Sequence, residues 1–222
     1  MTRKPVIAMD GYSSTGKSSI SKIIAKQLGL IHMDTGALYR GITFFALQNC
    51  YKNNAIDLDC LYSKFSEIQL EFKDVDEELV LFLNGTNISK EIRMQNISDN
   101  VSFIAKQSDV RAFLLQTQRE IAKNGGVIMD GRDIGTIVLP DADYKFFLTA
   151  SIEERTKRRF LELQQMGMEQ DIETVRENLM TRDKIDSERE IAPLVQADDA
   201  ILIDNSDINK EETIELILSY IK

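Results

Sequence analysis

The residues best suited to chemistry lie near the start of the chain, in the segment Gly11-Tyr12-Ser13-Ser14-Thr15-Gly16-Lys17-Ser18. This segment fits the pattern G-x-x-x-x-G-K-S/T in full. Glycines let the backbone wrap a phosphate with its N–H groups pointing inward, and the dipole of the following helix adds to the attraction. Lys17 can reach the β- and γ-phosphates, and the Ser18 hydroxyl can bind Mg²⁺. The segment therefore predicts a phosphate-binding loop for a nucleoside triphosphate.

The elements on either side of this loop support the prediction. Residues 6–9 form a short apolar run that is typical of a buried parallel strand, and four apolar residues then recur at helical spacing up to Leu28. Gly29 is placed to end that helix. A flexible Gly/Ser loop is the other interpretation of the motif. A strand before it and a helix after it are, however, the context that phosphate binding requires.

A single carboxylate, Asp130, follows the apolar run of residues 127–129. At the end of a buried strand it would lie where phosphoryl-transfer sites of this type place an acidic residue near the metal. A solvated carboxylate at a strand end is an equally good interpretation of the sequence. We therefore keep two expectations for Asp130: a neighbour or ligand of Mg²⁺, or an ordinary surface residue.

Seven arginines fall near the predicted ends of strands or helices. They are Arg40, Arg132, Arg155, Arg158, Arg159, Arg182 and Arg189. Single arginines usually lie on the solvated surface, and the spacing of Glu154 and Arg158 also fits an i,i+4 pair on an exposed helix. The phosphate-binding loop changes this assessment, because phosphoryl transfer between two nucleotides concentrates negative charge that guanidinium groups must offset.

The histidine content bears on the acceptor of the phosphoryl group. His32 is the only histidine in the chain, which leaves little scope for a histidine base. Transfer to an alcohol needs a group that takes the hydroxyl proton, whereas the oxygens of a phosphate acceptor are already largely ionised near neutral pH. The sequence therefore favours a phosphate acceptor.

The remaining pattern predicts an α/β fold. Apolar strand segments alternate with amphipathic helical segments over most of the chain, an order typical of a parallel sheet covered by helices. Residues 57–97 differ, because apolar and polar residues alternate there and Asn84-Gly85 is a strong hairpin signal. We therefore predict a core of residues 1–56 and 98–222 with a small antiparallel β insert at 57–97.

Local signals place some turns and helix ends. Asp109 is expected to cap the helix that follows it, and Ser151 with Glu154 fits a capping box at the start of a basic helix. An acidic turn is predicted at residues 74–78, between two strands of the insert. These signals concern element boundaries and do not affect the prediction of the fold class.

The composition argues against several classes of protein. A formal net charge of -9 disfavours nucleic acid as a partner, because its phosphate backbone is repelled. Two cysteines and one histidine are too few for a Cys/His zinc site, and the low cysteine count fits a reducing cytoplasm. The apolar run near the start is too short for a signal sequence or a membrane span. We therefore expect a cytoplasmic protein with no membrane partner.

Five segments of the chain resemble bacterial cytidylate kinases in order and spacing, and the likeness covers nearly the whole chain. They are Asp10–Ser18, Asp34–Arg40, Asp130–Gly135, Glu153–Arg159, and Arg182–Arg189 followed by Ala192-Pro-Leu. The resemblance implies a three-layer P-loop fold with a central parallel sheet, a β-rich insert that binds the nucleoside monophosphate, and a short helical lid at about residues 155–190. It also implies ATP and Mg²⁺ as cofactors, CMP and dCMP as substrates, and a monomer.

The resemblance implies roles at matched positions. For ATP, the implied residues are Gly11, Tyr12, Ser13, Ser14, Thr15, Gly16, Lys17, Ser18, Ser19, Arg155 and Arg159. For the acceptor nucleotide they are Asp34, Thr35, Gly36, Tyr39, Arg40, Ser102, Arg111, Arg132, Asp133, Arg182, Asp186 and Arg189. Of these, the acceptor phosphate would contact Arg40, Arg132 and Arg189; the cytosine would contact Ser102, Arg111 and Asp133; the sugar would contact Arg182 and Asp186. The catalytic residues would be Lys17, Arg132, Arg158, Arg182 and Arg189.

Two alternatives to this assignment remain open. The chain could phosphorylate a different nucleoside monophosphate, or it could be a non-catalytic ATP-binding module that regulates a partner. The arginine-bearing motifs argue against the second alternative, since a pure ATP binder has no need of a second anion site. Tyr12 and Thr15 depart from the residues common in the family, but both stand at positions where the backbone does the binding.

Overall fold

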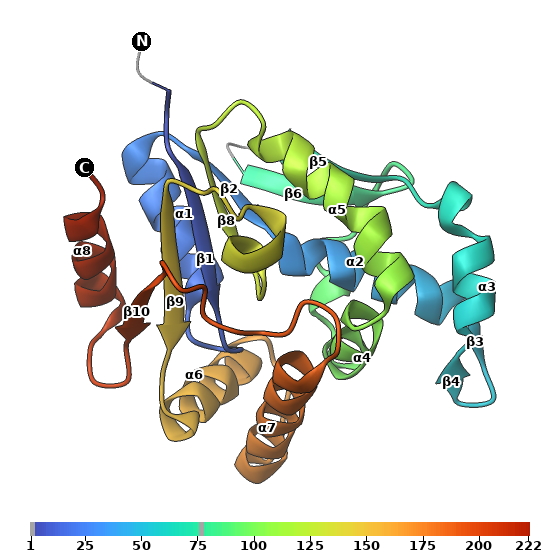
Figure 1. The fold of residues 1–222 in the computed structure, drawn as a ribbon. Helices are drawn as coiled ribbons and strands as arrows, with labels where there is room; N and C mark the ends of the chain where they lie inside the picture. Colours follow the sequence, from blue (N-terminus) through green and yellow to red (C-terminus); the bar gives the residue numbers. More distant parts are fainter. Residues whose placement is uncertain (1–2, 76–77) are drawn as a thin grey trace. The chain divides into compact units, whose positions relative to one another are not determined.

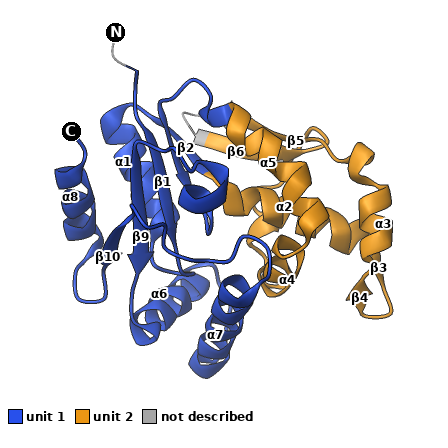
Figure 2. Ribbon diagram, in the orientation of Figure 1, with its two compact units in different colours: residues 1–33, 121–222 blue, residues 34–120 orange. Residues whose placement is uncertain are grey.

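The computed structural model describes residues 3–75 and 78–222, which divide into two compact units (Figure 1, Figure 2). Unit 1 consists of Met1–Met33 and Ile121–Lys222, and unit 2 is Asp34–Glu120. Unit 1 is therefore made of two stretches that are far apart in the sequence, while unit 2 is continuous.

Unit 1 is built on a five-stranded sheet with the order β10-β9-β1-β8-β2. Its strands are β1 (Val6–Gly11), β2 (Ile31–Asp34), β8 (Val127–Asp130), β9 (Tyr144–Thr149) and β10 (Ile201–Asp204). β1 pairs in parallel with both β8 and β9, and β9 pairs in parallel with β10. The predicted α/β fold with a central parallel sheet is confirmed. Because β1 has a neighbour on each side, the loop that follows it starts from the middle of the sheet.

One face of this sheet is covered by α1 (Lys17–Leu28) and α8 (Lys210–Tyr220). Ile7 and Met9 of β1 share a buried cluster with isoleucines of both helices, and complete burial of such a side chain contributes about 1.5–3 kcal/mol. Side chains alternate along a strand, so Asp10 points to the opposite face. The helix that Gly29 was predicted to end does end there, with Gly29 in the left-handed conformation at φ 61°.

A pair of helices, α6 (Ile152–Gln165) and α7 (Ile172–Glu188), follows β9 in unit 1. Leu163, Val175 and Leu179 form a small core of their own between the two helices. Three buried side chains stabilise this pair far less than the central cluster stabilises the sheet.

Across the described residues, no helix is both long enough and apolar enough to cross a membrane.

Unit 2 combines helices with two small antiparallel sheets. Its helices are α2 (Thr35–Asn49), α3 (Leu58–Ser63), α4 (Gln95–Ala105) and α5 (Ser108–Ala122), the last of which ends two residues into unit 1. Its strands are β3 (Tyr51–Lys52), β4 (Ala55–Ile56), β5 (Leu70–Val75), β6 (Glu78–Leu83) and β7 (Thr86–Asn87). Single helical turns lie at η1 (Phe65–Glu67) and η2 (Glu91–Arg93), and unit 1 has one at η3 (Ile134–Val138).

The β5–β6–β7 sheet lies where antiparallel strands were predicted. Asn84 and Gly85 have φ values of 49° and 80° and connect β6 to β7, as the hairpin signal predicts. The sheet packs closely on α2 at Gly41, where an added Cβ would lie 2.9 Å from a leucine of β5. Residues 76 and 77 of the predicted acidic turn lie outside the described residues.

Helix α5 begins before the predicted cap. The N–H of Arg111 donates to the carbonyl of Gln107, which places Asp109 inside the first turn of the helix rather than at its cap. The cap prediction for Asp109 was therefore wrong. Its carboxylate accepts a hydrogen bond from the Ser108 hydroxyl at 3.0 Å, and an acidic residue in the first turn still favours the helix dipole.

The predicted capping box at the start of α6 is realised through Ser151, while Glu154 pairs elsewhere. Ser151 Oγ accepts from the Glu154 N–H at 3.2 Å, and the Glu154 carboxylate accepts from Arg158 Nε at 3.2 Å. The ion pair with Arg158 therefore competes for the glutamate that the box would need. A complete box is present at the start of α8, between Asn209 and Glu212.

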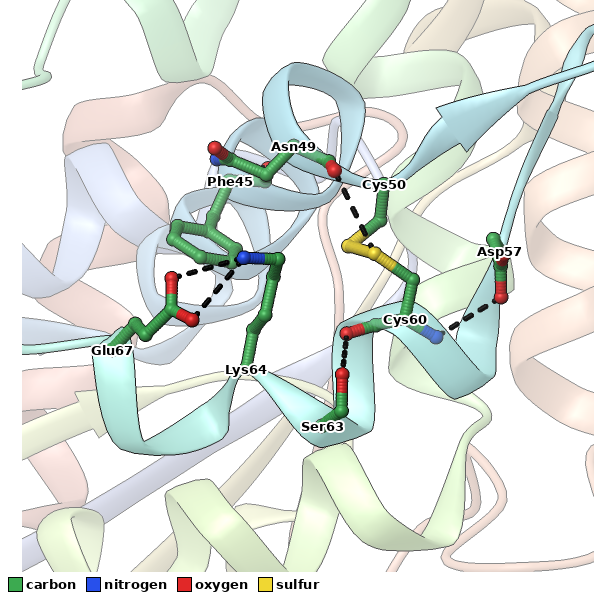
Figure 3. The surroundings of a disulfide bond; sticks show 8 residues. All are labelled: Phe45, Asn49, Cys50, Asp57, Cys60, Ser63, Lys64 and Glu67. Atoms are coloured by element: carbon green, nitrogen blue, oxygen red, sulfur yellow. Dashed lines mark hydrogen bonds and ion pairs between the residues drawn. A yellow bond between two sulfur atoms is a disulfide. The ribbon is translucent and has the colours of Figure 1, made fainter.

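A disulfide joins Cys50, which follows α2, to Cys60 in α3 (Figure 3). The β3–β4 hairpin lies between the two cysteines, and Asp57 caps α3 by accepting from the Cys60 N–H at 3.0 Å. The sequence did not predict this pair, because the two cysteines lie outside any recognised motif and their low number favours a reducing compartment. A cross-link of this kind stabilises a fold mainly by restricting the unfolded chain.

Candidate active site

The loop between β1 and α1 has the backbone conformation expected for holding a phosphate. Gly11, Ser14 and Gly16 have positive φ values of 144°, 61° and 90°. Residues with positive φ among residues with negative φ allow successive N–H groups to converge on an anion. At Gly11 an added Cβ would collide with the backbone of Leu148 in β9, so only glycine fits where β1 and β9 lie side by side.

Lys17 is held inside this loop. It is the first residue of α1 and only 6% exposed, and its Nζ donates to the carbonyl of Tyr12. The Thr15 hydroxyl donates to the same carbonyl at 3.0 Å, and the Ser19 hydroxyl donates to the carbonyl of Gly16 at 2.9 Å. The ammonium group thus faces oxygens of the loop. Phosphate oxygens of a bound nucleotide could contact the same ammonium group.

Asn205 and Arg158 tie the loop to the C-terminal part of unit 1. Asn205 Nδ2 donates to the carbonyl of Thr15 at 2.9 Å, and one Arg158 nitrogen lies 3.5 Å from the same carbonyl. Arg158 also donates to the backbone carbonyl of Asn205 at 2.8 Å. Arg158, predicted to act in catalysis, therefore lies beside the phosphate-binding loop.

Arg155 is buried against the same loop. Its guanidinium donates to the carbonyl of Ser13 at 3.4 Å, forms an ion pair with Asp183 of α7, and lies 5.2 Å from the centre of the Tyr12 ring. A guanidinium over an aromatic face is attracted by the ring quadrupole. Arg159 differs, since it pairs at 2.8 Å with a largely exposed glutamate on its own helix.

Three polar side chains, from α1, β8 and β2, meet next to the loop. Ser18 Oγ donates to Asp130 Oδ2 at 2.7 Å, and His32 Nε2 lies 2.6 Å from Asp130 Oδ1. Asp130 is only 2% exposed. The expectation of an ordinary surface residue is therefore wrong, while a role beside Mg²⁺ stays a prediction.

The pair of Ser18 and Asp130 fits a magnesium ion in its chemistry. Mg²⁺ prefers oxygen ligands and usually takes only one or two carboxylates from the protein, with water and phosphate oxygens completing its shell. Within the described residues, no group of three or more His, Cys, Asp or Glu side chains could hold a metal ion. One hydroxyl and one buried carboxylate, 2.7 Å apart, are what a nucleotide-bound Mg²⁺ would require of this chain.

A cluster of buried charges lies on α7 and on the loop after β8. Arg132 Nε donates to Asp186 Oδ2 at 2.9 Å, and Arg189 donates to Asp133 Oδ1 at 3.3 Å. Arg182 stands one turn before Asp186 on α7 and is also buried. Burial raises the pKa of Asp186, but the three arginines outweigh it and hold the pKa below its usual value. The cluster therefore keeps Asp186 ionised.

This cluster contacts the phosphate-binding loop directly. Arg132 NH2 donates to the Ser13 hydroxyl at 2.8 Å. Burial lowers the pKa of Arg132, but Asp186 and nearby carboxylates raise it above its usual value. Five of the predicted acceptor residues and the loop thus lie together in unit 1, and guanidinium groups of the cluster contact the loop.

Asp10 connects the loop to η3 on the other face of the sheet. Its carboxylate accepts from the backbone N–H groups of Ile134 and Gly135 at 2.8 and 2.7 Å. Burial raises its pKa to about 6, the two N–H groups oppose this change, Asp133 adds to it and Lys17 opposes it. The sequence analysis did not predict Asp10 as a functional residue. The signal that could have identified it is an acidic residue near the end of an apolar strand.

The predicted acceptor residues of unit 2 start at α2. Asp34 caps this helix by accepting from the Ala37 N–H at 3.3 Å, directly before the buried Thr35. Arg40 donates to the carbonyl of Ile92 and to the Ser98 hydroxyl, both at 3.2 Å. Arg40 is therefore fixed by η2 and α4.

The other predicted residues of unit 2 lie on α2, α4 and α5. The guanidinium of Arg111 lies 5.4 Å from the centre of the Tyr39 ring and donates to the carbonyl of Ala105 at 3.1 Å. Ser102 is buried on α4. Gly36 has little room for a side chain, because an added Cβ would lie 3.0 Å from an oxygen of Asp34.

Comparison with known proteins identifies the family. A family model described as cytidylate kinase matches residues 7–222. The chain belongs to the cytidylate kinase family. A cytidylate kinase from Flavobacterium johnsoniae is 46% identical over an alignment 223 positions long, which covers 99% of this chain and 96% of that protein. The cytidylate kinase of Geobacillus sp. (strain WCH70) is 45% identical, over 97% and 95%, and that of Bacillus cereus (strain B4264) is 41% identical, over 100% and 97%.

Membership of the cytidylate kinase family makes this chain a kinase, an enzyme that transfers a phosphoryl group, as the sequence predicted. A crystal structure of an uncharacterized protein from Eubacterium ventriosum resembles it over 99% of this chain and 98% of that one, with a TM-score of 0.52. At 15% identity, this likeness concerns the fold alone.

Sequence reasoning missed four residues that contact the predicted site: Asp10, His32, Asp183 and Asn205. His32 was considered only as a base. Asn205 and Asp183 offered no signal, because their partners are 190 and 28 residues away in the sequence.

Proposed function

We propose that this kinase transfers the γ-phosphoryl group of ATP to CMP and dCMP, giving ADP and CDP or dCDP, with Mg²⁺ bound to the nucleotide. The observation that carries the proposal is the contact between the phosphate-binding loop and the buried charge cluster, through Ser13 and Arg132. A loop alone would serve any ATP-binding module. A second set of guanidinium groups beside it is what a phosphate acceptor needs.

On the donor side, the loop from Gly11 to Ser19 would surround the ATP phosphates, with the Lys17 ammonium group on the β- and γ-phosphates. Ser18 and Asp130 would hold Mg²⁺, which supplies positive charge at the phosphate oxygens. Arg155 and Arg159 of α6 would contact ATP. Exclusion of water from this site strengthens each of these electrostatic contacts.

On the acceptor side, the family resemblance assigns roles to residues of unit 1 and, separately, to residues of unit 2. Arg40, Arg132 and Arg189 would grip its phosphate, Ser102, Arg111 and Asp133 would read the cytosine, and Arg182 with Asp186 would contact the sugar. Asp34, Thr35, Gly36 and Tyr39 would line the acceptor nucleotide as well. A carboxylate and a guanidinium together can donate to and accept from the edge of a cytosine, which is the basis for selecting it.

The chemical step needs no protein base. An ionised phosphate oxygen of CMP would attack the γ-phosphorus of ATP, the bond from this phosphorus to the β–γ bridging oxygen would break, and ADP would leave with the bonding electrons. Lys17, Arg132, Arg158, Arg182 and Arg189 would offset the charge on the moving group. Positioning and charge neutralisation are therefore the contributions expected of the protein.

The test is ADP production by the purified protein with Mg-ATP and CMP, dCMP, UMP, AMP, GMP or dTMP in parallel. Turnover with CMP and dCMP alone supports the proposal. Turnover with another monophosphate would keep the phosphate chemistry and discard the roles given to Ser102, Arg111 and Asp133. Absence of turnover with all six would contradict the proposal.

Lys17→Ala tests the role of the loop. We expect an unchanged fold and a loss of at least about 100-fold in kcat, comparable to removal of one transition-state donor elsewhere. Lys26→Ala is the matched control, because Lys26 is exposed on the same helix. Near-normal turnover of the Lys17 variant would contradict the assignment.

We also propose a cytoplasmic monomer that binds neither nucleic acid nor membrane. The net charge of -9 supports the absence of nucleic acid binding, which duplex DNA titration at physiological salt would test. Disulfides are rare in reducing compartments, so this location predicts that Cys50 and Cys60 are largely thiols in cells. Alkylation of thiols at the moment of lysis, followed by mass spectrometry, checks this point.

A further inference from the structure

His32 contacts the carboxylate that the proposed function places beside the metal. It lies in β2, next to β8 in the sheet, and Asp130 is the last residue of β8. The imidazole Nε2 is 2.6 Å from Asp130 Oδ1, with side chains 18% and 3% exposed. A hydrogen bond this short between two largely buried groups fixes the orientation of both.

The two oxygens of Asp130 have different partners. Oδ2 accepts from the Ser18 hydroxyl at 2.7 Å, and Oδ1 faces His32. An ionised carboxylate can only accept hydrogen bonds, so Nε2 must carry the hydrogen in this contact. His32 therefore holds one oxygen and leaves the other directed at Ser18. Loss of His32 removes this contact and with it one constraint on the rotation that sets the direction of Oδ2 toward Ser18.

We propose that His32 is a positioning residue, which acts through Asp130 to set the affinity of the nucleotide complex for Mg²⁺. The inference rests on the proposed function, since it assumes a magnesium ion bound between Ser18, Asp130 and nucleotide phosphates. Side chains that orient a metal ligand typically change metal affinity by 10- to 100-fold when removed. His32 itself would touch neither substrate nor metal.

The test measures binding rather than turnover. Binding of a fluorescent ADP to the purified full chain is titrated with free Mg²⁺, from an EDTA-buffered start to saturation, in the absence of any acceptor. For His32→Leu we expect the free Mg²⁺ at half-maximal effect to rise about 10-fold or more. ADP affinity in EDTA should stay within about two-fold of the unmodified chain, because the loop itself is intact.

Two further variants separate positioning from general damage. His32→Gln keeps an N–H donor that can reach Asp130, so it should restore Mg²⁺ dependence to within about three-fold. Ile31→Ala changes the exposed neighbouring residue of β2 and should leave the dependence unchanged. If His32→Leu fails to unfold cooperatively, His32→Asn takes its place, since asparagine fits the space but is too short to reach the carboxylate.

The outcomes distinguish this inference from the proposed function. An unchanged Mg²⁺ dependence in His32→Leu, or an equal loss of ADP affinity with and without Mg²⁺, would overturn the positioning role alone. If the unmodified chain binds ADP with no Mg²⁺ dependence at all, the proposed function fails and this inference fails with it.

Discussion

Arg132 of unit 1 and Arg111 of unit 2 are held in different ways. In unit 1, Arg132 is paired at 2.9 Å with the carboxylate of Asp186, whose side chain is 5% exposed. In unit 2, Arg111 donates to a backbone carbonyl and faces the ring of Tyr39 at 5.4 Å. The first contact sets charge against charge in a largely buried place, while these two contacts of Arg111 are with uncharged groups.

This difference determines what each unit loses when a contact is removed. Deleting one partner of a buried ion pair leaves an uncompensated charge, which is far more destabilising than the loss of a neutral contact. Unit 1 should therefore be sensitive to charge and pH around its loop. Unit 2 should depend more on packing and on the link between Cys50 and Cys60.

The largest effect is expected from Asp186→Ala. It leaves Arg132, Arg182 and Arg189 without the carboxylate between them, so the free energy of unfolding should fall by about 3–5 kcal/mol. Urea denaturation measures the loss. Glu173→Ala is the control on the same helix, because its pair with Arg176 is exposed and should contribute at most about 1 kcal/mol. Equal losses in both variants would show that the buried cluster is not held by charge.

The next effect is the pH dependence caused by Asp10. Its pKa is raised from 3.8 to about 6 in the fold, so the folded state binds the proton more tightly than the unfolded chain. The stability that this provides is full below pH 3.8 and is lost as the pH rises through about 6. Between pH 3 and pH 8, the unfolding free energy of the unmodified chain should fall by about 3 kcal/mol relative to that of Asp10→Asn.

Asp143 provides a control of opposite sign for this measurement. The Val6 N–H lowers its pKa, burial opposes the change, and Arg3 adds to the lowering. Its stabilising contribution is therefore present above pH 3.8 and lost as the pH falls below it. Asp143→Asn should show a difference that grows with pH. A slope of the same sign in both variants would contradict the environment described for Asp10.

The disulfide should have a somewhat smaller effect, confined to unit 2. Cys50 and Cys60 are 10 residues apart, and closing a loop of that length restricts the unfolded chain by about 2–3 kcal/mol. Reduction by dithiothreitol should lower the unfolding free energy by this amount. In Cys60→Ser the reductant should leave the unfolding free energy unchanged. If dithiothreitol lowered the unfolding free energy of this variant by as much as that of the unmodified chain, the reductant would be acting at another place in the protein.

The sequence predicted the parts of the site that are local. The loop from Gly11 to Ser18 is a continuous motif, and the strand before it and helix after it have recognisable patterns, so its place after β1 is confirmed. The parallel sheet could be predicted for the same reason, because strand and helix patterns alternate along the chain. The same locality identified the Asn84-Gly85 turn.

What the sequence could not predict depends on contacts between distant segments. His32 meets Asp130 across 98 residues, and Asp10 meets the N–H of Gly135 across 125. No periodicity encodes such a pair, because strand order is decided by packing of the whole sheet. The helix start at Ser108 and the role of Glu154 were missed on a smaller scale, since an ion pair and a neighbouring turn competed with the expected caps.

The smallest effect tests the neutral partner of Arg111. A double-mutant cycle with Tyr39→Leu and Arg111→Met isolates the attraction between ring and guanidinium, which at 5.4 Å should amount to about 1 kcal/mol of coupling in the unfolding free energy. Tyr39→Phe keeps the ring, so a cycle with it should show little coupling. If the cycle with Tyr39→Leu gave a coupling of less than about 0.3 kcal/mol, the Tyr39 ring would only fill space. The difference in strength between this contact and the ion pair of Arg132 would then be larger still. A coupling of several kcal/mol would instead mean that the ring holds Arg111 as strongly as a carboxylate holds Arg132, and the two arginines would differ only in the chemistry of their partners.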